Sequence, residues 1–341
     1  MARIIEFVES FDVNPSTFLT RKWSSGGVNG FDVAGRHGNA ARFDFALGDA
    51  NLEKDLPDMA TRMCSFAIYI TTHTGSTTNA FLKIQDGSTV HLYLRLDATR
   101  HVQILRGDNT VLGTSTTALS LTTWYSIQVK ATIHDTTGAF NVLINSSSEI
   151  SGTNVDTRNG GNSTCNRLRF TQTDGSNFQF RIDDVVVASD TDTNPANNLL
   201  GDLKINKIQV SGNGSTNDWT VTGAGSNYQA VSEAGSDDDS TYVSTTGVGN
   251  TDLYNFTNTT VGDVKAVALN LTHRKDDSGP RTLKAVYRNG SGGTTTEQGS
   301  AFSCSETYSV RQLILETDPA TAAAWGQSGL DDAQFGVRLN S

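Results

Sequence analysis

The sequence predicts an all-β protein made of two tandem antiparallel β-sandwich domains. Its 341 residues favour two domains at about 150 residues each. Gly is abundant (32 residues) whereas charged residues make up only 18% of the chain, a mixture that excludes a coiled coil, collagen and a disordered polyelectrolyte. Short runs of alternating apolar and polar residues recur between Gly, Asn, Asp and Thr turns, and this period of two is typical of half-buried strands.

The first half of the chain contains ten such runs. Strands are expected at 4–8, 41–45, 65–71, 80–85, 91–96, 102–106, 125–133, 140–144, 168–173 and 178–187. The clearest pair is a hairpin in which Ile127 and Val129 face the core and Trp124, at the start of the strand, is also predicted to be buried. So many strands with so little helical periodicity must bury one face against a second sheet, which favours a jelly-roll sandwich.

A domain boundary is expected where apolar residues disappear. Residues 191–198 contain no large apolar side chain and include Pro195, so they are predicted to link a first domain at 1–190 to a second at 199–341. Strands in the second domain are expected at 203–210, 253–256, 264–271, 283–287, 308–315 and 334–339. A short helix is expected at 319–325, with Asp318 as its N-cap and Pro319 in its first turn.

The charge pattern argues against nucleic acid and membrane partners. The net charge is −10, and no basic cluster is denser than Arg167 with Arg169, whereas nucleic-acid binding normally needs a basic stripe. No run of about 18 apolar residues occurs, and Glu6 and Glu9 stand where a secretory signal would be basic and then apolar. A soluble protein without a secretory signal is therefore expected.

The cysteines do not form a disulfide pattern. They are three in number, far apart and without a CxxC spacing: Cys64, Cys165 and Cys304. Free thiols in a chain that folds in a reducing cytoplasm are therefore expected.

Several segments of the first half carry a resemblance. A Trp opens the strand at 124–130, a Gly turn leads into 138–145, and Ile182-Asp183-Asp184 lies in the terminal strand. This order resembles the concanavalin A-like, laminin-G-type lectin sandwich. The opening at 9–12, with Trp23 and the segment 35–38, is similar to the opening of such domains in tailed-phage virion proteins.

The second half resembles a module that follows lectin-like domains in phage structural proteins. The similar segments are 201–205, 218–219, 237–243, 318–325 and 334–337. The resemblance implies a virion protein assembled in the bacterial host cytoplasm, a second β-sandwich that serves virion assembly, other virion proteins as partners and a homo-oligomer. It leaves open whether the protein belongs to the tail or to the head.

No catalytic or cofactor site can be identified in the sequence. Glycan-cleaving enzymes on this kind of sandwich need alternating carboxylates, no E-x-D-x-E run occurs, and Asp183 and Asp184 are adjacent, which places them on opposite faces of a strand. The His residues lack zinc-site spacing, and there is no G-x-S-x-G motif. We therefore expect no enzyme, no catalytic residue and no cofactor.

Metal binding stays undecided at this point. Asp183 and Asp184 fit either a lectin-type metal site or, more simply, a strand end with one solvated carboxylate. The acidic pairs and triplets at 237–239, 276–277 and 331–332 do not match a calcium loop, and Asp in such turns commonly accepts backbone N–H bonds.

The expected function is that of a non-enzymatic structural and adhesive virion component. A tail-associated place is favoured, with host-surface polysaccharide as a candidate ligand and Trp219 and Trp325 as candidate contacts for a glycan or a partner, because both lie near polar loops. A capsid decoration protein is the first alternative, and a glycan-cleaving enzyme is the second because the fold permits it. The sequence does not decide the oligomeric state or which surface makes contacts.

Overall fold

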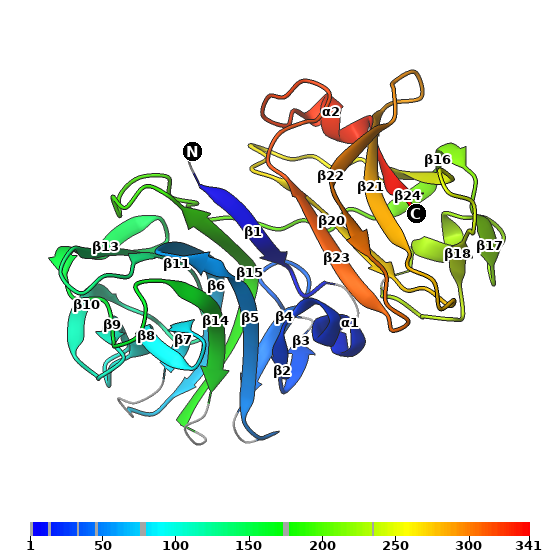
Figure 1. The fold of residues 1–341 in the computed structure, drawn as a ribbon. Helices are drawn as coiled ribbons and strands as arrows, with labels where there is room; N and C mark the ends of the chain where they lie inside the picture. The colour runs from blue at the N-terminus through cyan, green and yellow to red at the C-terminus, as the bar shows by residue number, and fades with distance from the viewer. Residues whose placement is uncertain are drawn as a thin grey trace. The chain divides into compact units, whose positions relative to one another are not determined.

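The structure is a computed structural model that describes residues 3–12, 15–32, 34–44, 47–75, 80–172, 177–233 and 235–341. It is nearly all β (Figure 1), and the predicted fold class of antiparallel β-sandwiches is confirmed. The chain forms two compact units, Met1–Asn206 and Lys207–Ser341. Two predicted strand ends, Phe45 and Thr173, lie outside the described residues.

The first unit is a sandwich of two large antiparallel sheets, named here sheet A and sheet B. Sheet A has the order β13 (Ser147–Val155), β12 (Gly138–Ile144), β11 (Trp124–Thr132), β6 (Thr61–His73), β15 (Phe178–Asp190), β4 (Ala40–Asp44) and β3 (Gly30–Asp32), and β1 (Ile4–Glu9) also pairs with β15. Sheet B has the order β10 (Val111–Ala118), β9 (His101–Arg106), β8 (Thr89–Leu96), β7 (Ala80–Asp86), β14 (Cys165–Gln172), β5 (Ala50–Met59) and β2 (Ser25–Gly27). One helix, α1 (Pro15–Lys22), lies between β1 and β2 in the chain.

Aromatic residues on the inner faces of both sheets form the core. Phe66 of sheet A meets Phe170 of sheet B edge to face, with 5.0 Å between the ring centroids. Ile127 and Val129 are fully buried in the same cluster, which confirms the inward face of β11. These contacts are the reason why the alternating pattern produces two packed layers.

The prediction for Trp124 was wrong. It is three positions from Ile127, and an odd offset along a strand places two side chains on opposite faces. Trp124 pairs with Tyr69 of β6 and is only half-buried. It therefore lies on the outer face of sheet A, away from the core.

The elements of the first unit that the sequence did not indicate are α1, β2, β3, β5, β10 and β13. The strand β5 carries Pro57 and several charges, and β10 and β13 are rich in Ser and Thr. Both β10 and β13 are edge strands of their sheets, and edge strands bury too little surface to show a clear apolar period.

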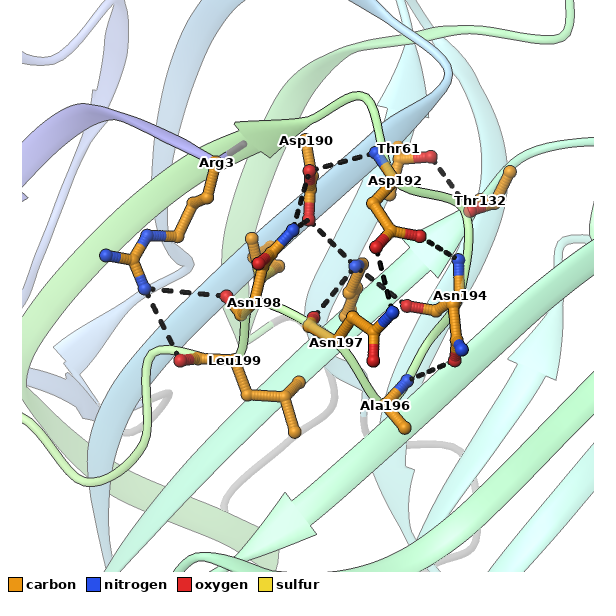
Figure 2. Close-up of polar contacts among 12 residues, drawn as sticks. Arg3, Thr61, Thr132, Asp190, Asp192, Asn194, Ala196, Asn197, Asn198 and Leu199 are labelled. Atoms are coloured by element: carbon orange, nitrogen blue, oxygen red, sulfur yellow. Dashed lines mark hydrogen bonds and ion pairs between the residues drawn. The ribbon is translucent and has the colours of Figure 1, made fainter. Parts of the chain in front are cut away.

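The segment 191–206 is not a free linker but a strap on the outer face of sheet A. Figure 2 shows its first part, from Asp190 to Leu199. The Lys130 ammonium of β11 forms an ion pair with Asp190 at 2.8 Å and donates to the backbone carbonyls of Asn194 and Asn197 at 2.9 Å each. Both side chains of the ion pair are fully buried.

The second part of the strap is also held by hydrogen bonds. Gly201 N donates to Gln128 Oε1 at 2.7 Å, and Ser65 Oγ donates to Gly201 O at 3.1 Å. Ile205 N donates to Asp184 Oδ1 at 2.8 Å. These anchors keep the strap in the first unit, which ends at Asn206. The sequence suggested a boundary at 191–198 because that prediction considered only apolar anchors, whereas the anchors of the strap are polar.

We expect the strap to resist proteolysis in the native protein. A broad-specificity protease needs several residues of freely mobile chain, and the hydrogen bonds to Lys130 and Gln128 hold the strap in place. Mass spectrometry of the first fragments should therefore show no cut within 191–198. Cleavage there as rapid as cleavage after the exposed Lys207 would contradict this expectation.

The second unit is a five-stranded sheet faced by a two-stranded ribbon. The sheet has the order β16 (Val210–Asn217), β19 (Thr251–Phe256), β24 (Ala333–Leu339), β21 (Thr282–Asn289) and β22 (Thr296–Ser303). The ribbon pairs β20 (Val267–His273) with β23 (Ser309–Leu315), and its Leu269 and Leu315 pack on Tyr287 and Phe335. The smaller elements are the β17 (Thr220–Thr222) and β18 (Tyr242–Ser244) pair, η3 (Gln229–Val231) and α2 (Gln327–Asp331).

Two predictions for the second unit were wrong. Residues 203–209 are not in a strand, because β16 begins at Val210. The expected helix at 319–325 is a turn in which Asp318 Oδ1 accepts the N–H of Ala320, and the helix α2 begins only at Gln327. Among the residues that the structure describes, no helix is long and apolar enough to cross a membrane.

Candidate functional site

A half-exposed aromatic pair stands on the outer face of sheet A. Trp124 of β11 and Tyr69 of β6 face each other in register, with 5.3 Å between their ring centroids and 45° between their planes. The Arg181 guanidinium of β15 lies over the Tyr69 ring at 5.1 Å. These three residues, called here the aromatic platform, offer an apolar surface bordered by a cation.

Amides and hydroxyls lie beside the aromatic platform. Gln179 of β15 donates to Asp44 Oδ1 at 2.8 Å and accepts from Thr72 Oγ1 at 3.3 Å. Arg42 of β4, opposite Arg181 in register, donates to the carbonyl of Asn29 at 3.3 Å. Planar hydrogen-bonding groups next to exposed rings give the platform both apolar and polar contacts for a ligand.

The outer face of sheet B has a different character, because it is rich in cations. Lys83 of β7 stands between Arg169 of β14 and Tyr93 of β8 in register. Arg95 is two residues beyond Tyr93 and therefore on the same face. Glu53 of β5 lies opposite Arg169 and forms an ion pair with it at 3.3 Å.

The pair Glu53 and Asp55 is a feature that the sequence analysis missed. The two carboxylates alternate along β5 and face the same side of sheet B, and Arg167 of β14 binds both, Asp55 at 2.6 Å and Glu53 at 3.6 Å. The E-x-D spacing is visible in the sequence, but Pro57 stands where an E-x-D-x-E run would need its last carboxylate.

Asp183 and Asp184 are both buried, so the expectation of one solvated carboxylate was wrong. A register shift follows Asp183 in β15, and Asp184 has φ of 52°, so the two side chains no longer follow simple alternation. Asp183 accepts the N–H of His37 at 3.0 Å. Burial raises the pKa of Asp183 to about 7 and that of Asp184 to about 6.

No metal centre can be assigned to these or to the other acidic residues that the structure describes. Within the described part of the chain, no group of three His, Cys, Asp or Glu side chains is arranged to hold a metal ion. In the acidic stretches singled out from the sequence, Asp239 pairs with Arg274 and Asp277 pairs with Arg281.

The two tryptophans predicted as contacts are held inside the second unit by packing and by indole hydrogen bonds. Trp325 is 4% exposed within a core cluster of the second unit, and its Nε1 donates to Leu315 O. Trp219 is half-buried, packs against the cluster of Leu283, Val337 and Leu339 and donates from Nε1 to Asn250 O. Nearness to polar loops was a poor guide, because tryptophan can fill a core and still reach a backbone carbonyl.

The two aromatic residues of the platform, Trp124 and Tyr69, both lie in strands that the sequence predicted, but they were not predicted to face outward. Counting alternate positions back from Ile127 puts Trp124 outside. Counting along 65–71 puts Tyr69 opposite to the buried Ile68 and Ile70. That the two rings meet depends on the pairing of β6 with β11, which no local pattern reveals.

Comparison with known proteins gives likenesses in fold. No family model matches the chain, and no curated protein matches it. Similar solved structures include "Cellulose induced protein, Cip1" (16% identity, TM-score 0.42, covering 54% of this chain and 97% of that one) and "Structure of alginate lyase Aly36B" (13%, 0.39, 54% and 96%). A "Sialidase" matches at 12% identity and TM-score 0.35, and the likeness covers 45% of this chain and 15% of the sialidase.

These likenesses correct the expected function. The expectation of a non-enzymatic structural and adhesive virion component is corrected: the similar structures just named carry the names of a sialidase, an alginate lyase and a cellulose-induced protein, and none of these names mentions a phage. At 12 to 16% identity, the likeness to each of them concerns the fold alone.

Proposed function

We propose that the first unit is a carbohydrate-binding module that holds a sugar chain on the aromatic platform of sheet A. The observation that carries the proposal is the half-buried Trp124–Tyr69 pair on the outer face of sheet A, with the Arg181 guanidinium over the Tyr69 ring. A sugar ring has an apolar face of C–H groups and a rim of hydroxyls, and a ring that stacks on Trp124 brings its hydroxyls toward the polar groups of Arg181 and Gln179. Exposed aromatic side chains of this kind commonly mark binding sites.

The position of the platform supports the proposal. The strap covers the part of sheet A around Lys130 and Gln128, whereas Trp124 and Tyr69 lie beyond it and stay half-exposed. Three adjacent strands, β11, β6 and β15, supply the three platform residues, so their spacing is fixed by the sheet. A rigid surface loses little conformational entropy when it binds a ligand.

Neutral oligosaccharides provide the test. We expect at least one of cellohexaose, xylohexaose and mannohexaose to bind, as measured by calorimetry, and to change tryptophan fluorescence. Trp124→Ala should weaken that binding by about tenfold or more, which corresponds to about 1.4 kcal/mol, whereas Trp124→Phe keeps an aromatic ring and should retain most of it.

A matched control and a kinetic readout complete the experiment. Val111→Ala removes an exposed apolar side chain from sheet B (46% exposed) and should leave binding unchanged. Reducing ends are measured in the same mixtures, and we expect none to be released because Glu53 and Asp55 are held in ion pairs. Failure of all three sugars to bind, or unchanged binding by Trp124→Ala, would refute the proposal.

A further inference from the structure

The outer face of sheet B gathers cations from three neighbouring strands. Arg95 belongs to β8, Lys83 to β7 and Arg169 to β14, and these strands are adjacent in the sheet. Their side chains point to the same side, because Leu94, Leu82 and Phe170, one position away in each strand, are buried in the core. Neighbouring strands lie about 4.8 Å apart. Arg169 stands directly opposite Lys83, whereas Arg95 lies diagonally from Lys83, two residues along β8 from the opposite residue Tyr93.

Two of these cations have no carboxylate partner among the residues that the structure describes. Glu53 and Asp55 neutralise Arg167 and Arg169. Lys83 and Arg95 form no ion pair with any carboxylate that the structure describes, and Arg95 Nε donates instead to Gln103 Oε1 at 2.9 Å. Burial, with the neighbouring Arg169, lowers the pKa of Lys83, as expected where like charges are desolvated together. In a chain of net charge −10, this excess of cations on one face is a local exception.

We infer that this face binds an acidic polysaccharide, with Lys83 and Arg95 each paired to a carboxylate of the sugar chain. A uronic-acid chain carries one carboxylate on every ring, so a single extended molecule can meet cations on successive strands. The guanidinium group of Arg95 matches a carboxylate in shape and hydrogen bonding. This site is separate from the aromatic platform, which lies on the other sheet, and the inference does not depend on the function proposed for that platform.

A nucleic acid is a poorer match for the same charges. Single-stranded nucleic acids bind through aromatic rings on which bases stack as well as through cations. The aromatic side chain on this part of the face, Tyr93, is only 8% exposed, and its hydroxyl donates to Asn109 at 2.7 Å. The face therefore offers charge without a stacking surface.

The experiment uses the full chain and polygalacturonate as the probe. Affinity electrophoresis and calorimetry at low salt should show binding that weakens as salt screens the charges. The double variant Lys83→Gln/Arg95→Gln should weaken binding by about tenfold or more. The double variant Lys207→Gln/Lys265→Gln removes the same two positive charges from exposed positions of the second unit and should stay within about twofold.

Two further variants separate the alternatives. Lys83→Arg keeps the positive charge and leaves Arg95 in place, so it should keep binding, which distinguishes loss of charge from loss of folding. Trp124→Ala should leave polygalacturonate binding unchanged, so failure of this inference and failure of the platform are distinguishable. The inference is overturned if wild-type protein does not bind polygalacturonate at low salt, if both Gln double variants lose binding equally, or if poly(dT) binds as tightly as polygalacturonate.

Discussion

Replacement of Lys130 by methionine is expected to lower the free energy of unfolding by about 3 to 5 kcal/mol, the range for breaking a buried ion pair by removal of one partner. The change leaves the Asp190 carboxylate fully buried without its cation and removes the donor that holds the carbonyls of Asn194 and Asn197. Urea denaturation of the wild type and the variant measures the effect. The strap should then become sensitive to protease, because its first anchor is lost.

The double variant Lys130→Met/Asp190→Asn tests the cause. It removes the charge that the single variant leaves unpaired, so it should recover part of the lost stability, and the coupling can be read from a double-mutant cycle. Lys207→Met alters an exposed lysine and should change stability by less than about 0.5 kcal/mol. A Lys130→Met variant within 1 kcal/mol of wild type would show that the buried pair does not hold the strap.

A second large effect is expected at Asp184, whose replacement by asparagine should stabilise the protein at pH 8 and not at pH 4. Burial raises the pKa of Asp184 to about 6, above the value of about 3.9 for an unfolded chain. The folded state therefore binds the proton more tightly, and the free energy of unfolding falls as pH rises from about 4 to 6. At about 1.4 kcal/mol per pH unit, Asp184→Asn should gain about 1 to 3 kcal/mol above that window.

The surroundings of Asp184 make asparagine a suitable replacement. Its Oδ1 accepts the N–H of Ile205, a bond that an amide oxygen can also accept, and its Oδ2 has no hydrogen-bond partner within the described ranges. The charged groups near it are Asp12, Asp202 and Arg36 and the neighbouring Asp183, with Arg36 at 3.8 Å and His37 at 4.0 Å from Oδ2. The substitution removes the charge opposite Arg36, whose shorter ion pair, to Asp202 at 2.6 Å, should remain.

Measurement of stability by denaturant at pH 4, 6 and 8 gives the test. Burial lowers the pKa of His37, so its contribution to stability rises with pH, opposite to that of Asp184. His37 is present in the wild type and in the variant, so its contribution enters both measurements. Asp202→Asn, a change at an exposed carboxylate, is the control and should produce no comparable pH-dependent gain. Equal stability of wild type and Asp184→Asn at pH 8 would contradict the assignment of the raised pKa to this side chain.

The sequence by itself determined the architecture of the first unit. The alternation of Ile127 and Val129, and the turn before the strand 140–144, are local patterns, and a strand exposes one face to water and one to the core wherever it pairs. All ten strands predicted there coincide with observed strands and needed only such local information; two of them, 41–45 and 168–173, are described as far as Asp44 and Gln172. The predictions weakened at edge strands and in polar loops, where burial leaves little pattern in the sequence.

Only the tertiary structure decided where ligands can bind and how the chain leaves the first unit. Trp124 meets Tyr69 because β6 pairs with β11, and Lys83 meets Arg169 because β7 pairs with β14 across about 80 residues of chain. Lys130 anchors a segment more than 60 residues away through backbone carbonyls. Because every residue has such a carbonyl, the sequence does not show which ones Lys130 binds. Strand adjacency and polar anchors of this kind are long-range properties, whereas the period of two in the sequence reports only which face of each strand is buried.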